Sequence, residues 1–212
     1  MLAAFSDAFR LMSSLDPQFL GIVGLSLRVT LSAVALAALV GLPLGAMLGV
    51  SRFPGRAGIV VIINALMGLP PVVAGLIVFL MLSRSGPFGS FGLLFSPTAM
   101  ILVQAVLVLP IVMALTRQTI EDLWIEYREY LTSLGLDGLR AIPTLLWDAR
   151  FSLVTSLLAG FGRASAEVGA VLIVGGNIAG YTRTMTTAIA LETSKGDLPL
   201  ALGLGIVLLS VT

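Results

Sequence analysis

Two charged side chains, Arg163 and Glu167, lie four residues apart inside a long apolar stretch. On one helix this spacing places both side chains on the same face, where they can pair. Each ionised group at mid-membrane costs about 2.5 to 3.5 kcal/mol on insertion scales, so we expect the pair to face protein or a watery cavity. Two interpretations stay open: a charge pair beside a translocation path, or a structural tie between helices.

A second polar group follows at the end of the same stretch, where Gly176-Asn177 precedes Thr182-Arg183-Thr184. Glycine-rich backbone, threonine hydroxyls and a guanidinium are donors that an oxyanion can use without covalent chemistry. A turn that joins two membrane spans explains the same residues. The candidates for a translocation path are therefore Arg163, Glu167, Gly176, Asn177, Thr182, Arg183 and Thr184.

Catalytic chemistry has few residues to rest on in this chain. Cysteine and histidine are both absent, which removes disulfides, thiolates, imidazole metal ligands and the commonest general base. Without a Gly-x-x-x-x-Gly-Lys-Ser/Thr motif we expect no ATP site, and we expect no metal and no cofactor in this chain. The 12 basic and 11 acidic residues give a net charge of +1 and no basic tract, which argues against nucleic acid. No nucleophile and base are paired, so we expect no enzyme.

The composition indicates a lipid environment. Apolar residues make up 58% and charged residues 11% of the chain, with a mean hydropathy of +1.07, whereas a soluble domain is about a quarter charged. A bilayer core about 30 Å thick needs about 20 apolar residues of helix. We predict an all-α membrane protein, a bundle of about five transmembrane helices at residues 19–50, 59–82, 97–115, 151–174 and 198–212. The fifth span reaches only about 22 Å, so it tilts or, as we favour, the native chain continues past Thr212.

The charges and the N-terminal segment predict how the spans are oriented. Residues 1–18 carry Leu2, Phe5, Phe9 and Met12 on one side, as in an amphipathic helix that lies at an interface or caps the bundle. Cytoplasmic loops carry an excess of Lys and Arg, which places the N-terminus outside and residues 117–150 in the cytoplasm. The predicted cytoplasmic side has six basic residues, namely Arg52, Arg56, Arg117, Arg128, Arg140 and Arg150. The opposite side has four, namely Arg10, Arg84, Arg183 and Lys195.

The glycines and amide residues inside the predicted spans are most simply explained by contacts between helices. Gly41, Gly45 and Gly49 recur every four residues, which lets helix backbones approach closely within the subunit or between two copies. Asn64 and Gln104 can hydrogen-bond across helices, each for about 0.6 to 2 kcal/mol. The prolines within the spans remove backbone donors and are expected to bend their helices.

The polar segment at residues 117–150 has apolar residues at helical spacing up to Leu134, stops at Gly135 and resumes as a second amphipathic piece. We expect two short helices that present a docking surface or pack under their own bundle. From Glu129 to Gly135, with Leu145 about ten residues later, the segment resembles the cytoplasmic "EAA" loop of binding-protein-dependent ABC importer permeases. Two small residues and a proline of that motif are replaced here. The resemblance implies ATPase-coupling contacts at Glu126, Glu129, Leu134, Gly135 and Leu145, and we call residues 117–150 the coupling segment.

A longer resemblance, to the permeases of oxyanion importers, covers residues 161–197. It rests on four motifs, namely Arg163-Ala164, Glu167-Val168-Gly169-Ala170, Gly176-Asn177-Ile178 and the threonine-rich run that starts at Thr182. Gly175-Gly176-Asn177-Ile178 together with Thr184-Met185-Thr186-Thr187 and Glu192-Thr193-Ser194-Lys195-Gly196 most resembles the tungstate permeases, and next the molybdate permeases.

This family resemblance implies the type I permease fold of ABC importers, with a cytoplasmic coupling loop. It implies a homodimer in the cytoplasmic (inner) membrane that docks a cytoplasmic ATPase dimer, which binds ATP and magnesium. An external binding protein would deliver an oxyanion, tungstate or molybdate. The alternative is an ion-gradient-driven secondary transporter or channel, which would want inverted repeats and a titratable membrane acid, for which Glu167 is the one candidate.

Overall fold

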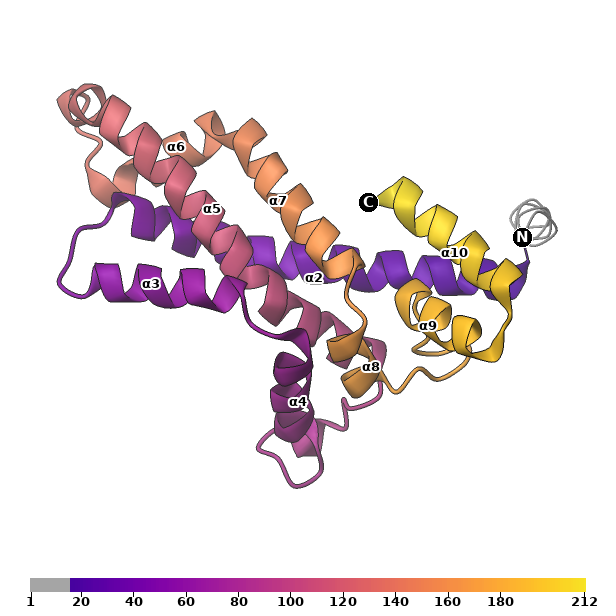
Figure 1. Ribbon diagram of the computed structural model, residues 1–212. Helices are drawn as coiled ribbons and strands as arrows, with labels where there is room; N and C mark the ends of the chain where they lie inside the picture. Colours follow the sequence, from indigo (N-terminus) through magenta and orange to yellow (C-terminus); the bar gives the residue numbers. More distant parts are fainter. Residues whose placement is uncertain (1–15) are drawn as a thin grey trace. The chain divides into compact units, whose positions relative to one another are not determined.

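The computed structural model describes residues 16–212 of the chain (Figure 1). This part contains nine α-helices, two short 3-10 helices and no strand, which confirms the all-α fold class. In chain order the elements are α2 (Pro17–Val50), α3 (Arg56–Met67), α4 (Pro71–Leu82), η1 (Gly89–Phe91), α5 (Pro97–Ser133), η2 (Gly138–Ala141), α6 (Ile142–Asp148), α7 (Arg150–Ser165), α8 (Gly169–Gly175), α9 (Met185–Lys195) and α10 (Leu198–Val211). The amphipathic segment predicted at residues 1–18 lies outside the described residues, apart from residues 16–18, where α2 begins.

The second predicted span, residues 59–82, is not one helix. α3 ends at Met67, and the Gly68 N–H donates to the Ala65 carbonyl at 3.1 Å. α4 begins at Pro71 after an extended Pro70 with φ −61° and ψ 123°. A proline has no N–H to donate and restricts the residue before it to an extended conformation, so two prolines in a row end one helix and start the next. The bend expected from the prolines is therefore a complete break.

The helix that begins the third predicted span continues far beyond residue 115, where we expected it to end. α5 runs from Pro97 to Ser133 and includes the first of the two short helices expected in the coupling segment. No glycine or proline interrupts the helical periodicity of residues 117–134, so the helix extends through them. It ends at Gly135, which has φ of +78°, and the next N–H, that of Leu136, donates to the Leu131 carbonyl at 2.9 Å. The predicted stop at Gly135 agrees with the structure.

Two helices, α2 and α5, are long and apolar enough to cross a membrane, judged by length and composition. The number rises to four if α3 with α4 and α7 with α8 each form one broken span. α10 is apolar but has only 14 residues. The described residues thus offer two to four crossings by this measure, against the five that hydropathy predicted.

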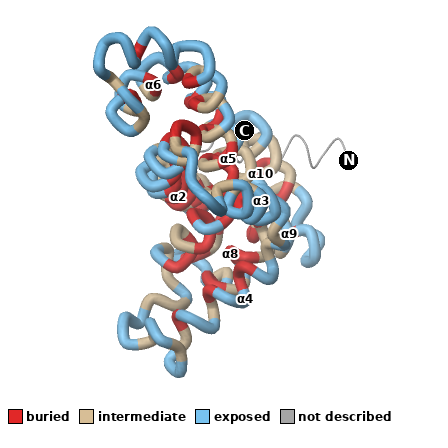
Figure 2. The backbone as a smooth tube through the Cα atoms, turned by 90° about the vertical axis from the view of Figure 1, so that its left-hand side faces the viewer, coloured by how far each residue is buried: buried red, intermediate tan, exposed pale blue. Residues whose placement is uncertain are grey.

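The contacts divide the chain into two compact units. Unit 1 comprises the residues up to Ala33, Pro70–Gln104 and Ala164–Thr212, and unit 2 comprises Val34–Leu69 and Ala105–Arg163. In unit 2, buried and exposed residues lie close together around α6, coloured red and pale blue in Figure 2. The buried residues form one cluster, which we call the coupling core: Ala46, Val50, Ile120, Trp124, Leu131, Ala141, Leu145, Ala149 and Leu153. The coupling core packs the coupling segment against the C-terminal part of α2.

Unit 1 has a second buried cluster where α9 and α10 lie beside the N-terminal part of α2 (Figure 1). Its members come from these three helices: Phe19, Ile22, Met185, Ala188 and Leu204. In the same unit α4 packs on α8 so closely that a Cβ on Gly75 would lie 2.8 Å from the Cα of Ala170. The loops that carry the polar residues of unit 1 are therefore anchored on both sides by packed helices.

The glycine series of α2 packs against α5 of the same chain, within unit 2. A Cβ on Gly45 would lie 2.7 Å from the Met113 carbonyl oxygen and 2.8 Å from the Thr116 Cβ. Cβ atoms on Gly41 and Gly49 would also come within 2.9 and 3.1 Å of α5. Of the two packing roles considered from the sequence, the structure places these glycines in contacts within the subunit.

Replacing Gly45 with alanine is expected to destabilise the chain by about 1–3 kcal/mol, because the added methyl group forces α2 and α5 apart. Gly24→Ala is the matched control in the same helix, since a Cβ there meets nothing within 4 Å. Thermal unfolding in detergent, followed by circular dichroism, should show a lower midpoint for Gly45→Ala than for Gly24→Ala. Equal midpoints would contradict the close approach of the two helices.

Candidate functional site

Most of the predicted coupling residues are exposed on the coupling segment. Glu126, Glu129 and Gly135 are exposed, and Leu134 is 60% exposed at the end of α5. Large apolar side chains that face solvent from a chain segment rich in charge indicate an interaction surface. Acidic and apolar groups are therefore both exposed on the coupling segment in unit 2.

Leu145 is not among these exposed residues. Its side chain is 1% exposed and packs in the coupling core with Leu131 and Trp124. α6 turns Leu145 inward because Ala141 and Ala149, four residues before and after it, are buried with it. The residue that the family resemblance implies as a contact thus supports the surface from beneath.

Trp147 is a surface residue that we did not single out as a contact. It is 72% exposed on α6, and Arg150 lies with its guanidinium carbon 5.1 Å from the indole centroid. An open groove runs between α6 and the end of α5, lined by Tyr127, Tyr130, Leu131, Thr144, Leu145, Trp147 and Asp148. The signal in the sequence was a tryptophan at a polar position of an amphipathic helix.

An ion-pair network ties α5 to the beginning of α3 within unit 2. Arg56 Nη2 lies 2.8 Å from one carboxylate oxygen of Glu121, and Arg117 pairs with the other oxygen. Arg56 also donates from Nε to the Leu48 carbonyl at 2.8 Å. In the sequence, Arg56 and Arg117 served only as markers of orientation. The structure shows that they also fix the α2–α3 turn to α5.

Glu167 is not on the same helix as Arg163, contrary to the expectation of an i, i+4 pair. α7 ends at Ser165, and Glu167 lies in the break before α8 begins at Gly169. Glu167 is 4% exposed, its Oε1 accepts the Ala170 N–H at 3.0 Å, and its carbonyl accepts the Thr186 hydroxyl at 2.8 Å. The fourth predicted span is therefore also broken, and a direct pair between Arg163 and Glu167 stays a prediction.

The glycine and threonine residues after α8 form one tight turn. Gly176 and Asn177 have φ of +70° and +51°, which is the left-handed conformation that ends a helix. Thr182 is fully buried, donates its hydroxyl to the Gly175 carbonyl at 2.6 Å and accepts the Ile178 N–H at 2.9 Å. Gly176, Asn177 and Thr182 thus come together as the sequence suggested, and the hydrogen bonds of Thr182 close the turn.

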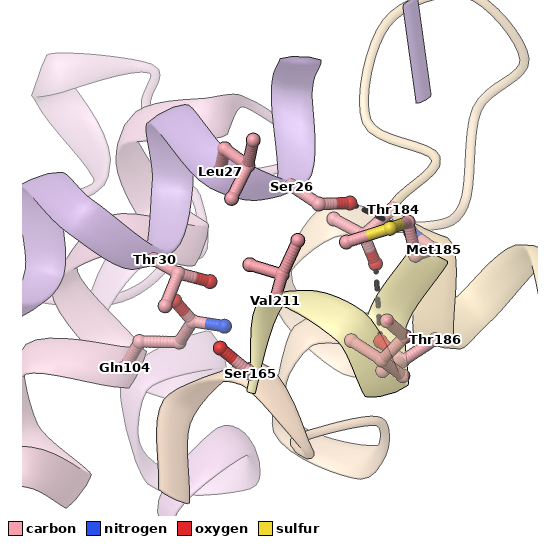
Figure 3. A pocket seen from close by; sticks show the side chains of 10 residues that line it. Ser26, Leu27, Thr30, Gln104, Ser165, Thr184, Met185, Thr186 and Val211 are labelled. Atoms are coloured by element: carbon pink, nitrogen blue, oxygen red, sulfur yellow. Dashed lines mark hydrogen bonds between the residues drawn. The ribbon is translucent and has the colours of Figure 1, made fainter. Parts of the chain in front are cut away.

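Thr184 begins α9 and faces a small polar pocket inside unit 1. Its hydroxyl forms a capping box with Thr187. Ser26 of α2 accepts the Met185 N–H at 2.7 Å, which joins α2 to the same helix start. Figure 3 shows the polar side chains around this pocket: Ser26, Thr30, Gln104, Ser165, Thr184 and Thr186. Sequence reasoning missed Ser26 and Thr30, although two hydroxyls four residues apart in an apolar span were a signal for them.

Gln104 is the buried amide of this pocket. It is 3% exposed, and its Nε2 donates to the Ala164 carbonyl at 3.1 Å, which is the inter-helix hydrogen bond expected from the sequence. Its Oε1 has no hydrogen-bond partner among residues 16–212. The pocket has a volume of about 10 Å³, which is about the room that one water needs. Asn64, the other amide, is exposed on α3.

Arg183 lies just before α9 and shares the carboxylate of Glu192 with Lys195. Arg183 Nη1 is 3.7 Å from Glu192 Oε1, and Lys195 Nζ is 3.0 Å from the same oxygen. Glu192 is 6% exposed, and two cations beside one carboxylate leave this cluster with a net positive charge. Hydroxyl, amide and guanidinium groups suit non-covalent binding of an anion. Within residues 16–212 no group of three or more His, Cys, Asp or Glu side chains is placed to hold a metal ion.

The chain is similar in sequence to known proteins over most of its length. No family model matches it. It is 41% identical over 208 residues to the tungstate uptake system permease protein TupB of Peptoclostridium acidaminophilum, which covers 98% of this chain and 91% of the relative. It is 42% identical over 195 residues to the probable anion ABC transporter permease protein of Haloferax volcanii, covering 90% and 84%. It is 40% identical over 160 residues to TupB of Campylobacter jejuni, covering 76% and 67%.

Proposed function

Because the chain belongs to the permease subunits of oxyanion ABC importers, we propose that it forms the passage for tungstate across the cytoplasmic membrane. It is a multi-pass membrane protein built of apolar helices. Two of its relatives are named as tungstate uptake permeases, which supports tungstate as the solute. Molybdate has the same tetrahedral shape and charge and is the nearest competitor.

The energy comes, in this proposal, from a separate ATPase dimer that binds ATP and magnesium. The coupling segment is the docking surface, with Glu126, Glu129, Leu134 and Gly135 as contacts. The exposed position of these residues over the coupling core supports this assignment, because a close-packed base transmits a push without yielding. Leu145 contributes from inside that base.

The remaining partners are a second copy of this chain, with the pore between the two copies, and an external binding protein that delivers the anion. The coupling segment lies in the cytoplasm and the N-terminus outside. The excess of arginine on the coupling-segment side supports this orientation. Closure of the ATPase would push the coupling segments together and switch the bundle between outward and inward access, which is a rigid-body two-state change.

The path residues divide into two roles in this proposal. Gly176, Asn177 and Thr182 shape the turn after α8, and Glu167 fixes the start of α8. The side chains of Glu167 and Thr182 make their hydrogen bonds within the chain, so these two residues are poor candidates for direct ligands. Arg183 and Thr184 then provide charged and hydroxyl groups of the polar lining in unit 1, and Arg163 remains a candidate for the path in unit 2.

Reconstitution of the chain with its ATPase and external binding protein tests the proposed function. We expect the proteoliposomes to accumulate tungstate only when ATP and magnesium are present on the ATPase side. A hydrolysis-deficient ATPase should reduce uptake to the level of empty vesicles. Tungstate uptake by the chain alone, driven by an ion gradient without nucleotide, would instead favour a secondary transporter. Parallel assays with molybdate and sulfate rank the solutes.

A further inference from the structure

Arg183 is largely buried without an adequate acceptor. Its side chain is 14% exposed, and its contact with Glu192, at 3.7 Å, is longer than a hydrogen bond. Its Nε is buried and has no hydrogen-bond partner in the part of the chain that the structure describes. A guanidinium carries five N–H donors, and donors removed from water need acceptors. The described part of the protein thus leaves the buried Nε–H of Arg183 without an acceptor and gives Nη1 only a long contact with Glu192.

The ion pair with Glu192 does not satisfy the hydrogen-bond donors of the Arg183 guanidinium. The Oε1 atom of Glu192 that faces Arg183 already accepts a hydrogen bond from Lys195 at 3.0 Å. Lys195 therefore makes the closer contact, and Arg183 is the additional positive charge. Two further acids of unit 1 cap helices: Asp16 accepts the N–H groups of Gln18 and Phe19 at 2.9 Å at the start of α2, and Asp197 accepts the Leu200 N–H at 3.4 Å at the start of α10.

The side chain of Arg183 lines an open groove in unit 1, formed by the first turns of α2 and the turn that precedes α9. The groove has a volume of about 260 Å³, and its wall includes Gln18 and Gly21 on one side and Gly180 and Tyr181 on the other. The glycines leave room beside the guanidinium, while the amide of Gln18 and the hydroxyl of Tyr181 are further hydrogen-bonding groups. A planar guanidinium matches a tetrahedral oxyanion by two parallel hydrogen bonds.

We propose that Arg183 is the principal ligand of an oxyanion-binding site in this groove, and that the bound oxyanion competes with Glu192 for the guanidinium. The proposal rests on the proposed function, which supplies the class of anion. The bound dianion would take two donors of Arg183, and Glu192 would stay paired with Lys195. The long contact between Arg183 and Glu192 is then the weak interaction that the anion replaces.

A structural role for Arg183 makes the opposite prediction about neighbouring residues. Arg183 could instead serve only to neutralise the buried Glu192. In that case, removing Lys195, which lies nearer to Glu192, would weaken tungstate binding at least as much as removing Arg183. If Arg183 is an anion ligand, only its own replacement should affect binding strongly. Removing the charge of Glu192 should then tighten binding, because the competitor is gone.

The test is titration of the detergent-solubilised permease–ATPase complex with sodium tungstate, without the external binding protein, at ionic strength held constant with sodium chloride. The thermal midpoint reports binding, because a ligand that binds the folded state raises it. We expect Arg183→Gln to weaken the apparent affinity for tungstate about tenfold or more, the loss of one charge-assisted contact. Arg183→Lys keeps the positive charge but loses the two parallel N–H donors of the guanidinium, so its affinity for tungstate should lie between those of wild type and Arg183→Gln.

Two control variants decide between the roles. Lys195→Gln should weaken tungstate binding much less than Arg183→Gln does, through the freed Glu192 carboxylate alone, and Glu192→Gln should bind tungstate several-fold more tightly than wild type. The proposal is overturned if Arg183→Gln titrates like wild type, if Lys195→Gln weakens binding as much as Arg183→Gln, or if tungstate shifts the wild-type midpoint no more than chloride does. Should Arg183→Gln fail to fold, the affinities of Arg183→Lys and Glu192→Gln decide in the same way.

Failure of this site and failure of the proposed function are distinguishable. ATP-dependent uptake of tungstate by the wild-type complex, together with unchanged binding in Arg183→Gln, would remove the site and keep the function. Tungstate binding that depends on Arg183 in a complex that imports no tungstate would keep an anion site and remove the function.

Discussion

Replacing Leu145 with alanine is expected to lower the free energy of unfolding by about 2–5 kcal/mol, because it leaves a cavity in the coupling core. The side chain is 1% exposed, so the surrounding residues have little freedom to fill the space. Unfolding of the purified chain in detergent, followed by tryptophan fluorescence, measures the loss, since Trp124 belongs to the same core. ATP-dependent uptake should fall together with stability, because the proposed docking surface loses its rigid base.

Leu134→Ala is the matched control, since it removes the same atoms from a side chain that is 60% exposed. We expect its stability to stay within about 0.5 kcal/mol of wild type. Its defect should appear in ATPase docking, measured by co-purification of the two subunits and by uptake. Similar unfolding curves for both variants would contradict the buried position of Leu145, and full docking by Leu134→Ala would remove Leu134 from the coupling surface.

Replacing Thr182 with valine is expected to destabilise unit 1 by about 2–6 kcal/mol. Valine has the same shape but no hydroxyl, so the Gly175 carbonyl and the Ile178 N–H both lose the partner that the structure gives them. Each buried group left unpaired costs about 1–3 kcal/mol. Because this turn carries Arg183 and Thr184, uptake of tungstate should be lost together with stability.

Thr182→Ser separates the hydroxyl from the methyl group. Serine keeps both hydrogen bonds, made at 2.6 and 2.9 Å in the wild type, so most of the stability should return. Thermal unfolding of the two variants in detergent and uptake by the reconstituted complex provide the comparison. If Thr182→Ser were as unstable as Thr182→Val, the methyl packing and not the hydroxyl would hold the turn.

The family and the class of fold were accessible from the sequence. Motifs between Arg163 and Gly196 resemble oxyanion importer permeases, and relatives that are 40–42% identical confirm that family. Hydropathy predicted apolar helices, and the all-α class is confirmed for the described residues. These features depend on composition and local order along the chain, which the sequence contains directly.

Helix boundaries were predicted well only where a local signal exists. The stop at Gly135 was found because glycine adopts the φ of +78° that the chain needs there. The break between α7 and α8 has no proline, and the residues around it, Ala166 to Val168, carry no strong breaking signal. Glu167 holds that break through hydrogen bonds to Ala170 and Thr186, and the second of these partners lies 19 residues away in the chain.

By itself, the sequence determined that the chain is helical and suited to a bilayer, that it belongs among the oxyanion importer permeases, and which residues are chemically able to bind an anion. Only the tertiary structure decided the role of each. Leu134 and Leu145 are the same residue type in one segment, yet one is exposed and the other buried. Lys195 reaches Glu192 closely, whereas Arg183 does not. Burial and hydrogen-bond partners depend on which distant residues meet in space, and a linear spacing does not contain that information.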